Sequence, residues 1–300
     1  MSRAGFVAIA GRPNAGKSTL LNKIIGEKVA IVSPRPQTTR RAIRGVATGD
    51  DSPQGGTGWQ LVLVDLPGVQ RPRDPLTERM QRRMDLELRE SDAVLFVLNG
   101  DQEIGPGDRF IAQAIKDAGL PAVTVLNKVD VLDRARTAAR LQAAEELGVQ
   151  GEIFPVSAKT GAGVGEVVKA LVDLVPEGPF LYPREDKTDL SLEVRLAEIV
   201  REQILHRTHD ELPHAVEVQV DEIAERDDGL LTVRAHAWAE TESQKGILVG
   251  KGGQMVRAVG TGARREMEAL MGRKVFLDLT VRVRKGWRRD DALLDRLGID

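Results

Sequence analysis

The chain has 300 residues, which is long for one compact domain, so two domains are expected. Its 41% hydrophobic and 29% charged residues are typical of a globular protein with a sizeable core, and the lack of cysteine excludes disulfides, thiolate metal sites and thiol nucleophiles. A net charge of −2 argues against a uniformly basic nucleic-acid-binding chain, and no apolar run reaches the ~18–20 residues that would span a bilayer.

The first 175 residues repeat one pattern, in which an apolar run ends in a polar or glycine-rich motif and a helical segment follows. The apolar runs are Phe6–Ala10, Leu61–Val64, Ala93–Leu98, Ala122–Leu126 and Glu152–Val156. The helical segments are Leu20–Ile25, Leu76–Glu90, Asp108–Ala118, Arg134–Leu147 and Val164–Leu174, and Gly49–Gly58 is expected to be a hairpin loop. Near-continuous hydrophobicity suits strands covered on both faces, so the pattern predicts a mostly parallel α/β sheet that binds its ligand at the carboxyl ends of the strands.

The first motif, GRPNAGKS from Gly11 to Ser18, lies between a predicted strand and a predicted helix and matches the phosphate-binding pattern G-x-x-x-x-G-K-[ST]. Glycines let successive backbone N–H groups point at the phosphates, and the helix adds the positive end of its dipole. Lys17 is expected to contact the β- and γ-phosphates, and the Ser18 hydroxyl to bind Mg²⁺. The alternative, a glycine turn feeding a helix, would not need Lys17 and Ser18. The predicted nucleotide-binding residues here are Gly11, Asn14, Ala15, Gly16, Lys17, Ser18 and Thr19.

The next motifs would respond to the γ-phosphate. Asp65 and Gly68, in the sequence DLPG, follow a predicted strand, so the carboxylate can hold Mg²⁺ and the glycine N–H can contact the γ-phosphate. In the polar loop before it, Thr39 is the preferred residue to reach Mg²⁺ and the γ-phosphate, with Thr38 as the alternative and a solvated loop residue as the other interpretation. The predicted metal ligands are Ser18, Thr39 and Asp65, and the predicted catalytic residues are Lys17, Thr39 and Gly68.

Two further motifs would select the base. Asn127, Lys128 and Asp130 form the sequence NKVD, in which Asp130 can accept two hydrogen bonds from the ring N–H and the amine of guanine. Adenine presents a different edge and would leave the carboxylate unpaired. The sequence SAK, formed by Ser157, Ala158 and Lys159, is expected to contact the guanine carbonyl and pack beside the ring. Four motifs in this order, each after a strand, predict a guanine nucleotide.

The pattern changes after the first 175 residues. Residues 176–190, with three prolines and no clear period, are expected to be a linker between a domain of residues 1–175 and a domain of residues 191–300. Beyond the linker, apolar residues alternate at 216–220, 231–237 and 275–283, which predicts a sheet with one buried face, covered by helices at Leu192–Leu205 and Met255–Met271. The segment Gln244–Arg289 holds twelve Lys/Arg and three Asp/Glu and is strongly positive.

A glycine loop, GKGG, joins two predicted helices inside this positive segment. A G-x-x-G loop between two helices is the backbone clamp of a KH domain, which grips about four single-stranded nucleotides. The order helix, strand, strand, helix, loop, helix, strand is that of a type II KH domain; the alternative is a glycine turn without a ligand. The predicted RNA-binding residues are Ile247, Gly250, Lys251, Gly252, Gly253 and Arg257. Arg282, Arg284, Lys285, Arg288 and Arg289 are either a solvated face or an accessory phosphate-binding patch.

Across its whole length the chain resembles the Era family of bacterial GTPases, within the TrmE-Era-EngA-YihA-Septin-like superfamily. The resemblance rests on RPNAGKSTLLN, VSPRPQTTR, DLPG, NKVD and SAK in the first half, and on YPREDKTD, REQILHRTHDELPHAVEV and AETESQKGILVGKGG in the second. It implies a Ras-like P-loop GTPase domain followed by an α+β type II KH domain, and hydrolysis of GTP to GDP with Mg²⁺. It also implies binding of 16S ribosomal RNA near its 3′ end and a role in maturation of the 30S subunit. A cytoplasmic monomer is expected; peripheral contact with the inner face of the cell membrane stays open.

Three positions refine this expectation. Leu66 stands where the family usually carries Thr, with little loss expected because its neighbours carry the metal and phosphate roles. Val69 stands where Ras-like switches carry a water-orienting Gln, and Gln70 is out of register, so intrinsic hydrolysis is expected to be slow. Asn14 has a counterpart in potassium-stimulated members of this class.

The rival functions are a small-molecule kinase or ATPase, and a membrane-associated signalling GTPase whose KH-like domain docks a protein.

Overall fold

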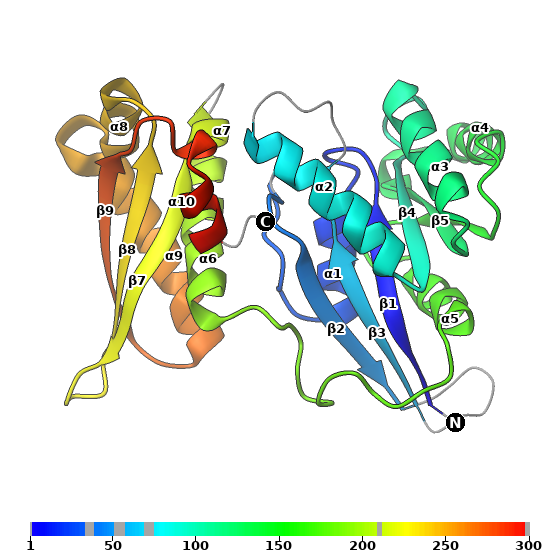
Figure 1. Cartoon of the computed structure of the whole chain (residues 1–300), viewed down its shortest axis with the longest axis horizontal. Coiled ribbons are helices and arrows are strands. Elements are labelled where there is room, and N and C mark those ends of the chain that lie inside the picture. The colour runs from blue at the N-terminus through cyan, green and yellow to red at the C-terminus, as the bar shows by residue number, and fades with distance from the viewer. Residues whose placement is uncertain (1, 34–38, 51–57, 69–74, 209–211, 298–300) are drawn as a thin grey trace. The chain divides into compact units, whose positions relative to one another are not determined.

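The computed structural model describes residues 2–33, 39–50, 58–68, 75–208 and 212–297 (Figure 1). The chain divides into two compact units. The first comprises residues 1–30 and 36–189, and the second comprises residues 31–35 and 190–299.

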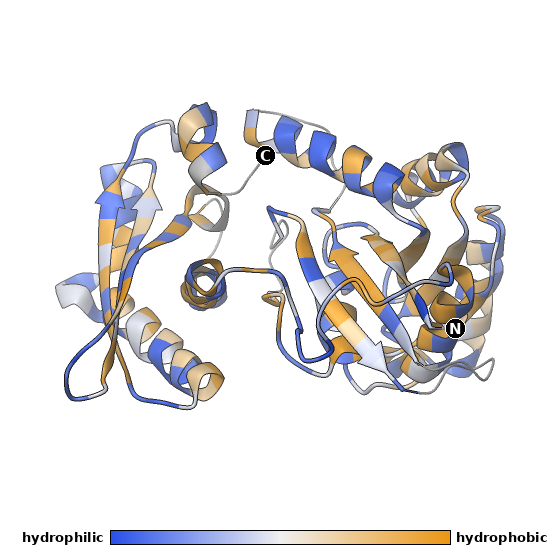
Figure 2. Cartoon of the chain, turned by 60° about the horizontal axis from the view of Figure 1, so that its bottom comes forward, coloured by the Kyte–Doolittle hydropathy of each residue, from blue (hydrophilic) through white to orange (hydrophobic). Residues whose placement is uncertain are grey.

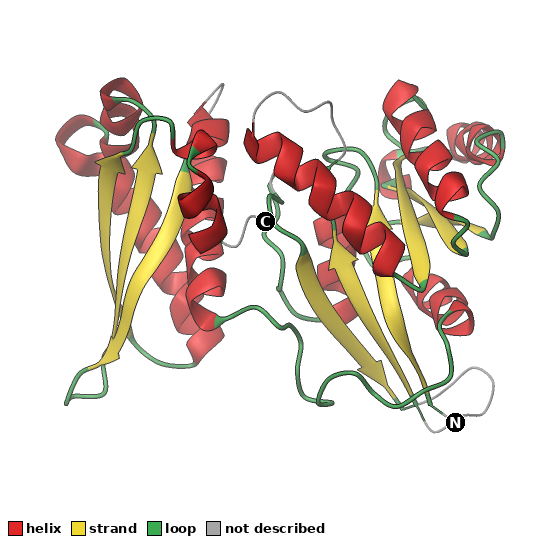
Figure 3. Cartoon of the chain, in the orientation of Figure 1, coloured by secondary structure: helices red, strands yellow, loops and turns green. Residues whose placement is uncertain are grey.

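The first unit is built on a six-stranded sheet with the order β2-β3-β1-β4-β5-β6 (Figure 3). The strands are β1 (Arg3–Ala10), β2 (Ile43–Gly49), β3 (Trp59–Asp65), β4 (Ala93–Asn99), β5 (Ala122–Asn127) and β6 (Ile153–Val156). All neighbouring pairs are parallel except β2 and β3, which are antiparallel. Every residue of β4 is buried, as its continuous apolar sequence predicts for a central strand with two covered faces.

Helices cover both faces of this sheet. They are α1 (Lys17–Ile25), α2 (Pro75–Glu90), α3 (Pro106–Ala118), α4 (Arg134–Glu145) and α5 (Val164–Leu174), with a 3₁₀ turn η1 (Val129–Val131). Side chains of α2, α3 and α4 share one apolar cluster with residues of β1, β3, β4 and β5, whereas α1 and α5 contact each other and the sheet. Figure 2 shows the strands largely in orange between helices with blue outer faces. The fold thus has three layers, with the carboxyl ends of five parallel strands at one edge.

The strand β2 is an addition to the predicted runs. Its sequence IRGVATG holds two glycines and two polar side chains, so it lacks the continuous hydrophobicity of the central strands. Gly45 lets β2 lie close to α1, because a Cβ there would require the Ile25 side chain to shift. β2 and β3 are joined by the predicted hairpin loop, of which residues 51–57 lie outside the described part of the chain.

The predicted linker is bonded to the first unit. Arg3 pairs with Glu177 and Gly45 with Thr188 as isolated antiparallel bridges, and the Val46 N–H donates to the carbonyl of Lys187 at 2.8 Å. The buried Gln60 side chain donates to the Tyr182 carbonyl at 2.9 Å and accepts the N–H groups of residues 181 and 182 at 2.8 and 2.9 Å. Residues 176–189 therefore belong to the first unit, although they form neither a helix nor a named strand.

The second unit is a three-stranded sheet with helices over one face. β7 (Glu217–Glu225) pairs antiparallel with β8 (Leu231–Ala239), which pairs parallel with β9 (Val275–Val283). Alternate residues of the strands pack with α6 (Leu192–Arg207) and α9 (Gln254–Met271) in one apolar cluster, as the alternation predicts. The shorter elements are α7 (Leu212–Ala215), α8 (Glu242–Val249), η2 (Lys251–Gly253), η3 (Trp287–Arg289) and α10 (Asp291–Arg296).

The C-terminal segment after β9 is an ordered part of this unit. Trp287 is fully buried, and its Nε1–H donates to the carbonyl of Ala215 at 2.9 Å. Leu293 and Leu294 of α10 are also buried. A six-residue helix is too short to show a period, so the sequence alone does not predict α10. Among the described helices, none is both long and apolar enough to cross a membrane.

Candidate nucleotide and RNA sites

The phosphate-binding motif forms the turn between β1 and α1. Gly16 has φ of 96° and Asn14 has φ of 62°, so the chain enters the left-handed region twice within three residues. A Cβ at Gly16 would collide with the Asn127 side chain, and one at Gly11 would lie 2.5 Å from the Val97 carbonyl oxygen. Both glycines therefore let the turn lie against the neighbouring strands, and α1 begins at Lys17, directly after the turn.

Lys17 is buried beneath this turn. Its ammonium donates to the carbonyls of Gly11 at 3.1 Å and Arg12 at 3.3 Å. Burial lowers the pKa of Lys17 from its ordinary value, and the charge of Asp65 opposes this shift. The two carbonyls hold the ammonium inside the loop whose N–H groups are expected to bind the phosphates.

Ser18, Thr39 and Asp65 meet beside Lys17. The Asp65 Oδ2 accepts hydrogen bonds from the Ser18 hydroxyl at 2.5 Å and the Thr39 hydroxyl at 3.0 Å, and the two hydroxyls are 3.3 Å apart. Burial raises the pKa of Asp65, against the lowering effect of Lys17 and of the two hydroxyl donors. The buried Asp65 Oδ1 has no hydrogen-bond partner in the described structure.

This oxygen set suits magnesium. Mg²⁺ prefers hard oxygen ligands and keeps several waters, so two hydroxyls and one carboxylate with an unpaired buried oxygen are a suitable donor set. Across the described ranges there is no group of three or more His, Cys, Asp or Glu residues arranged to hold a metal. Ser18, Thr39 and Asp65 therefore remain the predicted ligands of Mg²⁺.

The neighbouring switch positions are only partly described. Gly68 lies against the phosphate loop, since a Cβ there would be 2.8 Å from the Pro13 Cγ. Thr38, the alternative to Thr39, lies outside the described residues, as do Val69 and Gln70, on which the expectation of slow hydrolysis rests.

The predicted base-binding loops are joined to the phosphate loop by Asn127. Its buried side chain donates to the Ala15 carbonyl at 2.9 Å and accepts the Ala158 N–H at 2.9 Å. Asp130 is exposed, and its Oδ1 accepts a hydrogen bond from the buried Ser157 hydroxyl at 2.7 Å. Lys128, which lies between the end of β5 and the start of η1, has φ of 67°. The structure thus brings residues of three predicted motifs together, with Lys159 exposed beside them and Thr19 half-buried on α1.

The GKGG loop joins α8 and α9 in the second unit. Gly250, Gly252 and Gly253 have φ of 71°, 59° and 79°, which glycine adopts without strain. A Cβ at Gly250 would lie 2.8 Å from the Met255 Cβ, whereas one at Gly252 would meet nothing within 4 Å. Arg257 donates to the Gly252 carbonyl at 2.7 Å, and Ile247 on α8 is 53% exposed. The loop therefore presents open backbone beside two cations, Lys251 and Arg257.

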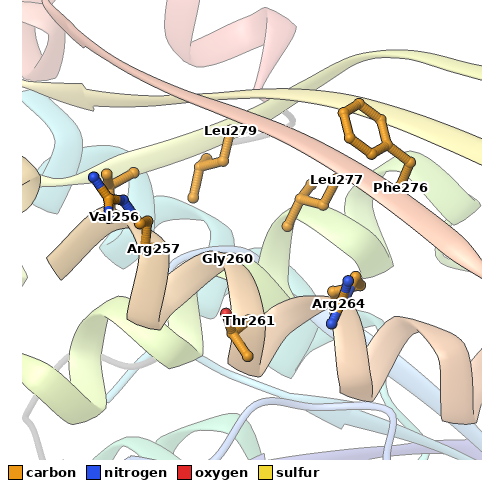
Figure 4. A pocket seen from close by; sticks show the side chains of 8 residues that line it. All are labelled: Val256, Arg257, Gly260, Thr261, Arg264, Phe276, Leu277 and Leu279. Atoms are coloured by element: carbon orange, nitrogen blue, oxygen red, sulfur yellow. The ribbon is translucent and has the colours of Figure 1, made fainter. Parts of the chain in front are cut away.

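A groove of about 350 Å³ begins beside this loop and runs between α9 and the edge strand β9 (Figure 4). Its lining residues are Val256, Arg257, Gly260, Thr261, Arg264, Phe276, Leu277 and Leu279. Leu277 and Leu279 extend from the strand toward the helix in Figure 4. Of these residues, only Arg257 is among the predicted RNA-binding residues. The four-residue spacing of Val256, Gly260 and Arg264, which places them on one face of α9, is the sequence signal for the others on the helix. An apolar floor with cations suits single-stranded nucleic acid.

The remaining cations of the positive segment have different surroundings. Arg284 pairs with Asp290 at 2.5 Å and lies 5.0 Å from the centre of the Trp238 ring. Arg282, Lys285 and Arg289 are exposed. Arg284 is therefore held in a structural contact, which leaves the exposed three as the part of the patch best suited to phosphates.

Comparisons with known proteins match both units of the chain. A family model described as "50S ribosome-binding GTPase" matches residues 6–128, and one described as "KH domain" matches residues 211–288. The curated GTPase Era of Mycobacterium avium (strain 104) is 46% identical over 302 residues, covering 99% of this chain and 98% of the relative. GTPase Era of Thermoanaerobacter sp. (strain X514) is 41% identical over 297 residues, covering 99% and 96%.

Two solved structures match the whole fold. A variant of Aquifex aeolicus Era bound to GDP and aluminium fluoride has a TM-score of 0.93 at 34% identity, covering 99% of each chain. An Era complex with MgGDPNP and nucleotides 1506–1542 of 16S ribosomal RNA has a TM-score of 0.93 at 35% identity, covering 100% of this chain and 99% of the other. The predicted fold class, a Ras-like P-loop GTPase domain followed by a KH domain, is confirmed. By identity and coverage, this chain belongs to the Era family of GTPases.

Proposed function

We propose that this GTPase binds the 3′-terminal region of 16S ribosomal RNA through its GKGG loop and acts in maturation of the 30S subunit. The observation that carries the proposal is the open glycine loop, which leads into a groove with an apolar floor and cations. The likeness over the full chain to Era solved with a 16S ribosomal RNA fragment supports it. We further propose a cytoplasmic monomer; membrane contact has no described feature in its favour.

The hydrolysis reaction transfers the γ-phosphoryl group of GTP to water. The water oxygen bonds to the γ-phosphorus, the bond to the β–γ bridging oxygen breaks, and GDP and inorganic phosphate leave. Mg²⁺ supplies positive charge at the phosphate oxygens when bound. Lys17 offsets negative charge at the β- and γ-phosphates, and the Gly68 N–H is suited to contact the γ-phosphate.

Two kinetic features follow from neighbouring residues. Val69 cannot orient a water molecule by hydrogen bonding, so intrinsic GTP turnover is slow until a partner or the ordered switch completes the site. Many turnovers per second by the purified protein would contradict this. Asn14 supports stimulation by K⁺. Equal rates in sodium and potassium would remove that part of the proposal.

GTP binding and RNA binding are coupled in this proposal. A hydrogen-bonded chain supports it: Glu87 on α2, which follows the DLPG motif, binds Arg44 on β2 at 2.9 Å, and Arg44 binds Asp189 at 3.4 Å. Asp189 is the last residue of the first unit before the second begins at Leu190. A change at α2 can therefore reach the connection between the units, and linkage requires the effect to be reciprocal.

Gly252→Asp tests the RNA site. Asp tolerates the left-handed backbone of Gly252, and a Cβ there meets no neighbour, so the variant keeps its fold while placing negative charge on the loop. Gly272→Asp is a matched control, because Gly272 has φ of 63°, also meets no neighbour and follows the opposite end of α9.

Crosslinking to a 16S 3′-end RNA should be lost in Gly252→Asp and kept in Gly272→Asp, with normal GTP binding in both. Unchanged crosslinking in Gly252→Asp would favour the rival in which the KH domain docks a protein. A competition assay in which ATP displaced GTP at equal concentration would favour a kinase or ATPase.

A further inference from the structure

The Arg12 side chain turns away from the phosphate-loop backbone and is held by the β4–α3 region. Its Nε donates to the Asp108 Oδ1 at 2.9 Å, and one terminal nitrogen donates to the Glu103 carbonyl at 3.1 Å. The packing is close, since a Cβ on Gly107 would lie 2.9 Å from the Arg12 Cδ. Arg12 therefore joins the phosphate loop to a segment about 96 residues later in the chain.

Asp108 is a buried and fully engaged partner. Its side chain is 2% exposed, and its second oxygen accepts the Gly105 N–H at 2.8 Å, which caps the start of α3. The carboxylate also lies in the first turn of α3, where the helix dipole favours negative charge. An exposed ion pair contributes little stability, but a buried carboxylate with both oxygens bonded fixes its partner in one geometry.

The backbone of Arg12 is part of the nucleotide site. Its carbonyl accepts hydrogen bonds from the Lys17 ammonium at 3.3 Å and from the Ala15 N–H at 3.3 Å. Whatever fixes residue 12 therefore fixes one of the two carbonyls that hold Lys17. A fixed Arg12 also holds the backbone turn between Arg12 and Ala15, whose N–H bonds to the Arg12 carbonyl.

We infer that Arg12 and Asp108 form a positioning pair that holds the phosphate loop in its nucleotide-binding geometry and thereby slows the release of GDP. Neither side chain needs to touch the nucleotide; the pair acts through the Arg12 backbone and Lys17. This role concerns the GTPase unit alone and is independent of the proposed RNA function.

The test is the rate of GDP release, measured with a fluorescent GDP analogue on the full-length protein. Arg12→Ala and Asp108→Asn should each release GDP ~10-fold faster, because phosphate interactions depend on loop geometry within about 1 Å. The Asn side chain keeps an acceptor for the Gly105 N–H, so α3 stays capped in Asp108→Asn. Arg12→Lys, which can donate to Asp108 but cannot bind both Asp108 and the Glu103 carbonyl in the geometry of the guanidinium, should give an intermediate rate.

Whether Asp108→Asn speeds or slows GDP release distinguishes the positioning role from a purely electrostatic effect of the Asp108 charge on the phosphates. Removing a negative charge near the phosphates would by itself slow GDP release, whereas loss of positioning accelerates it. The control is Arg109→Ala, which removes a positive charge from an exposed neighbour on α3 and should change the rate less than ~2-fold. The double variant Arg12→Ala/Asp108→Asn should match the faster single variant within ~2-fold, because both changes break one contact.

Three results would overturn the inference: slower release in Asp108→Asn, release within ~2-fold of the parent in both single variants, or multiplied effects in the double variant. Thermal melting of each variant confirms that the rates refer to folded protein. RNA affinity in the absence of nucleotide should be unchanged throughout.

Discussion

Asp130 is the residue on which guanine selectivity is expected to depend. Its exposed carboxylate is already oriented by the Ser157 hydroxyl, and a carboxylate can accept hydrogen bonds from the two N–H donors of a guanine ring. Its neighbours in the motif serve the scaffold, since Asn127 joins two loops through its amide.

Asp130→Asn should weaken GTP binding by ~10–100-fold, because the amide places a donor against a guanine donor. Xanthosine triphosphate, which carries a carbonyl where guanine carries its amine, should gain affinity. Titration calorimetry with both nucleotides measures the change. An unchanged GTP affinity would show that another residue reads the base.

Asn127→Ala should destabilise the first unit even without nucleotide. The change leaves the buried Ala158 N–H and Ala15 carbonyl unpaired, at ~1–3 kcal/mol each. The melting temperature should fall by ~5–10 °C, measured by circular dichroism. Lys159→Ala, at an exposed position of the adjoining motif, is the control and should leave it nearly unchanged. A similar small effect in both variants would contradict the bridging role.

The site residues differ in how far sequence predicts them. Lys17, Ser18, Asp65 and Asp130 could be predicted because each motif pairs a side-chain chemistry with a strand end. The contact between Arg12 and Asp108 could not, because nothing in either local sequence indicates which distant residue the fold brings near it.

The secondary-structure elements that could be predicted are those in which apolar residues follow a clear pattern. The buried parallel strands and the alternating strands of the second unit follow from their apolar patterns. β2, α7 and α10 were missed because short or partly polar segments carry no clear period, and their places depend on tertiary contacts such as Trp287 against Ala215.

The prolines of residues 176–190 indicate a linker, but they do not show that Gln60 anchors it. Gln60→Ala should leave three linker backbone groups without their partner. Hydrogen exchange should then rise at residues 181 and 182, while the central strand β4 keeps its protection. Gln81→Ala is the control, because the half-buried Gln81 side chain donates to Asp85 on the same helix, α2. Unchanged exchange at 181 and 182 would contradict the anchoring role.

At the scale of the whole molecule, one chain carries a predicted nucleotide site and a proposed RNA-binding groove. The nucleotide site is predicted at the carboxyl edge of the first sheet, and the groove lies between α9 and β9 of the second unit. The contacts of Arg44 with Glu87 and Asp189 supply a physical connection from α2 to the end of the first unit. Arg44→Gln should therefore reduce any effect of the nucleotide on RNA affinity while leaving GTP affinity within ~3-fold of the parent.

The affinity of the full-length protein for a 16S 3′-end RNA, measured by fluorescence anisotropy with GDP and with a non-hydrolysable GTP analogue, tests the coupled switch most directly. Coupling energies between sites are typically 1–3 kcal/mol, so the two dissociation constants should differ by at least ~5-fold, and by less in Arg44→Gln. Equal dissociation constants with the two nucleotides would contradict the account.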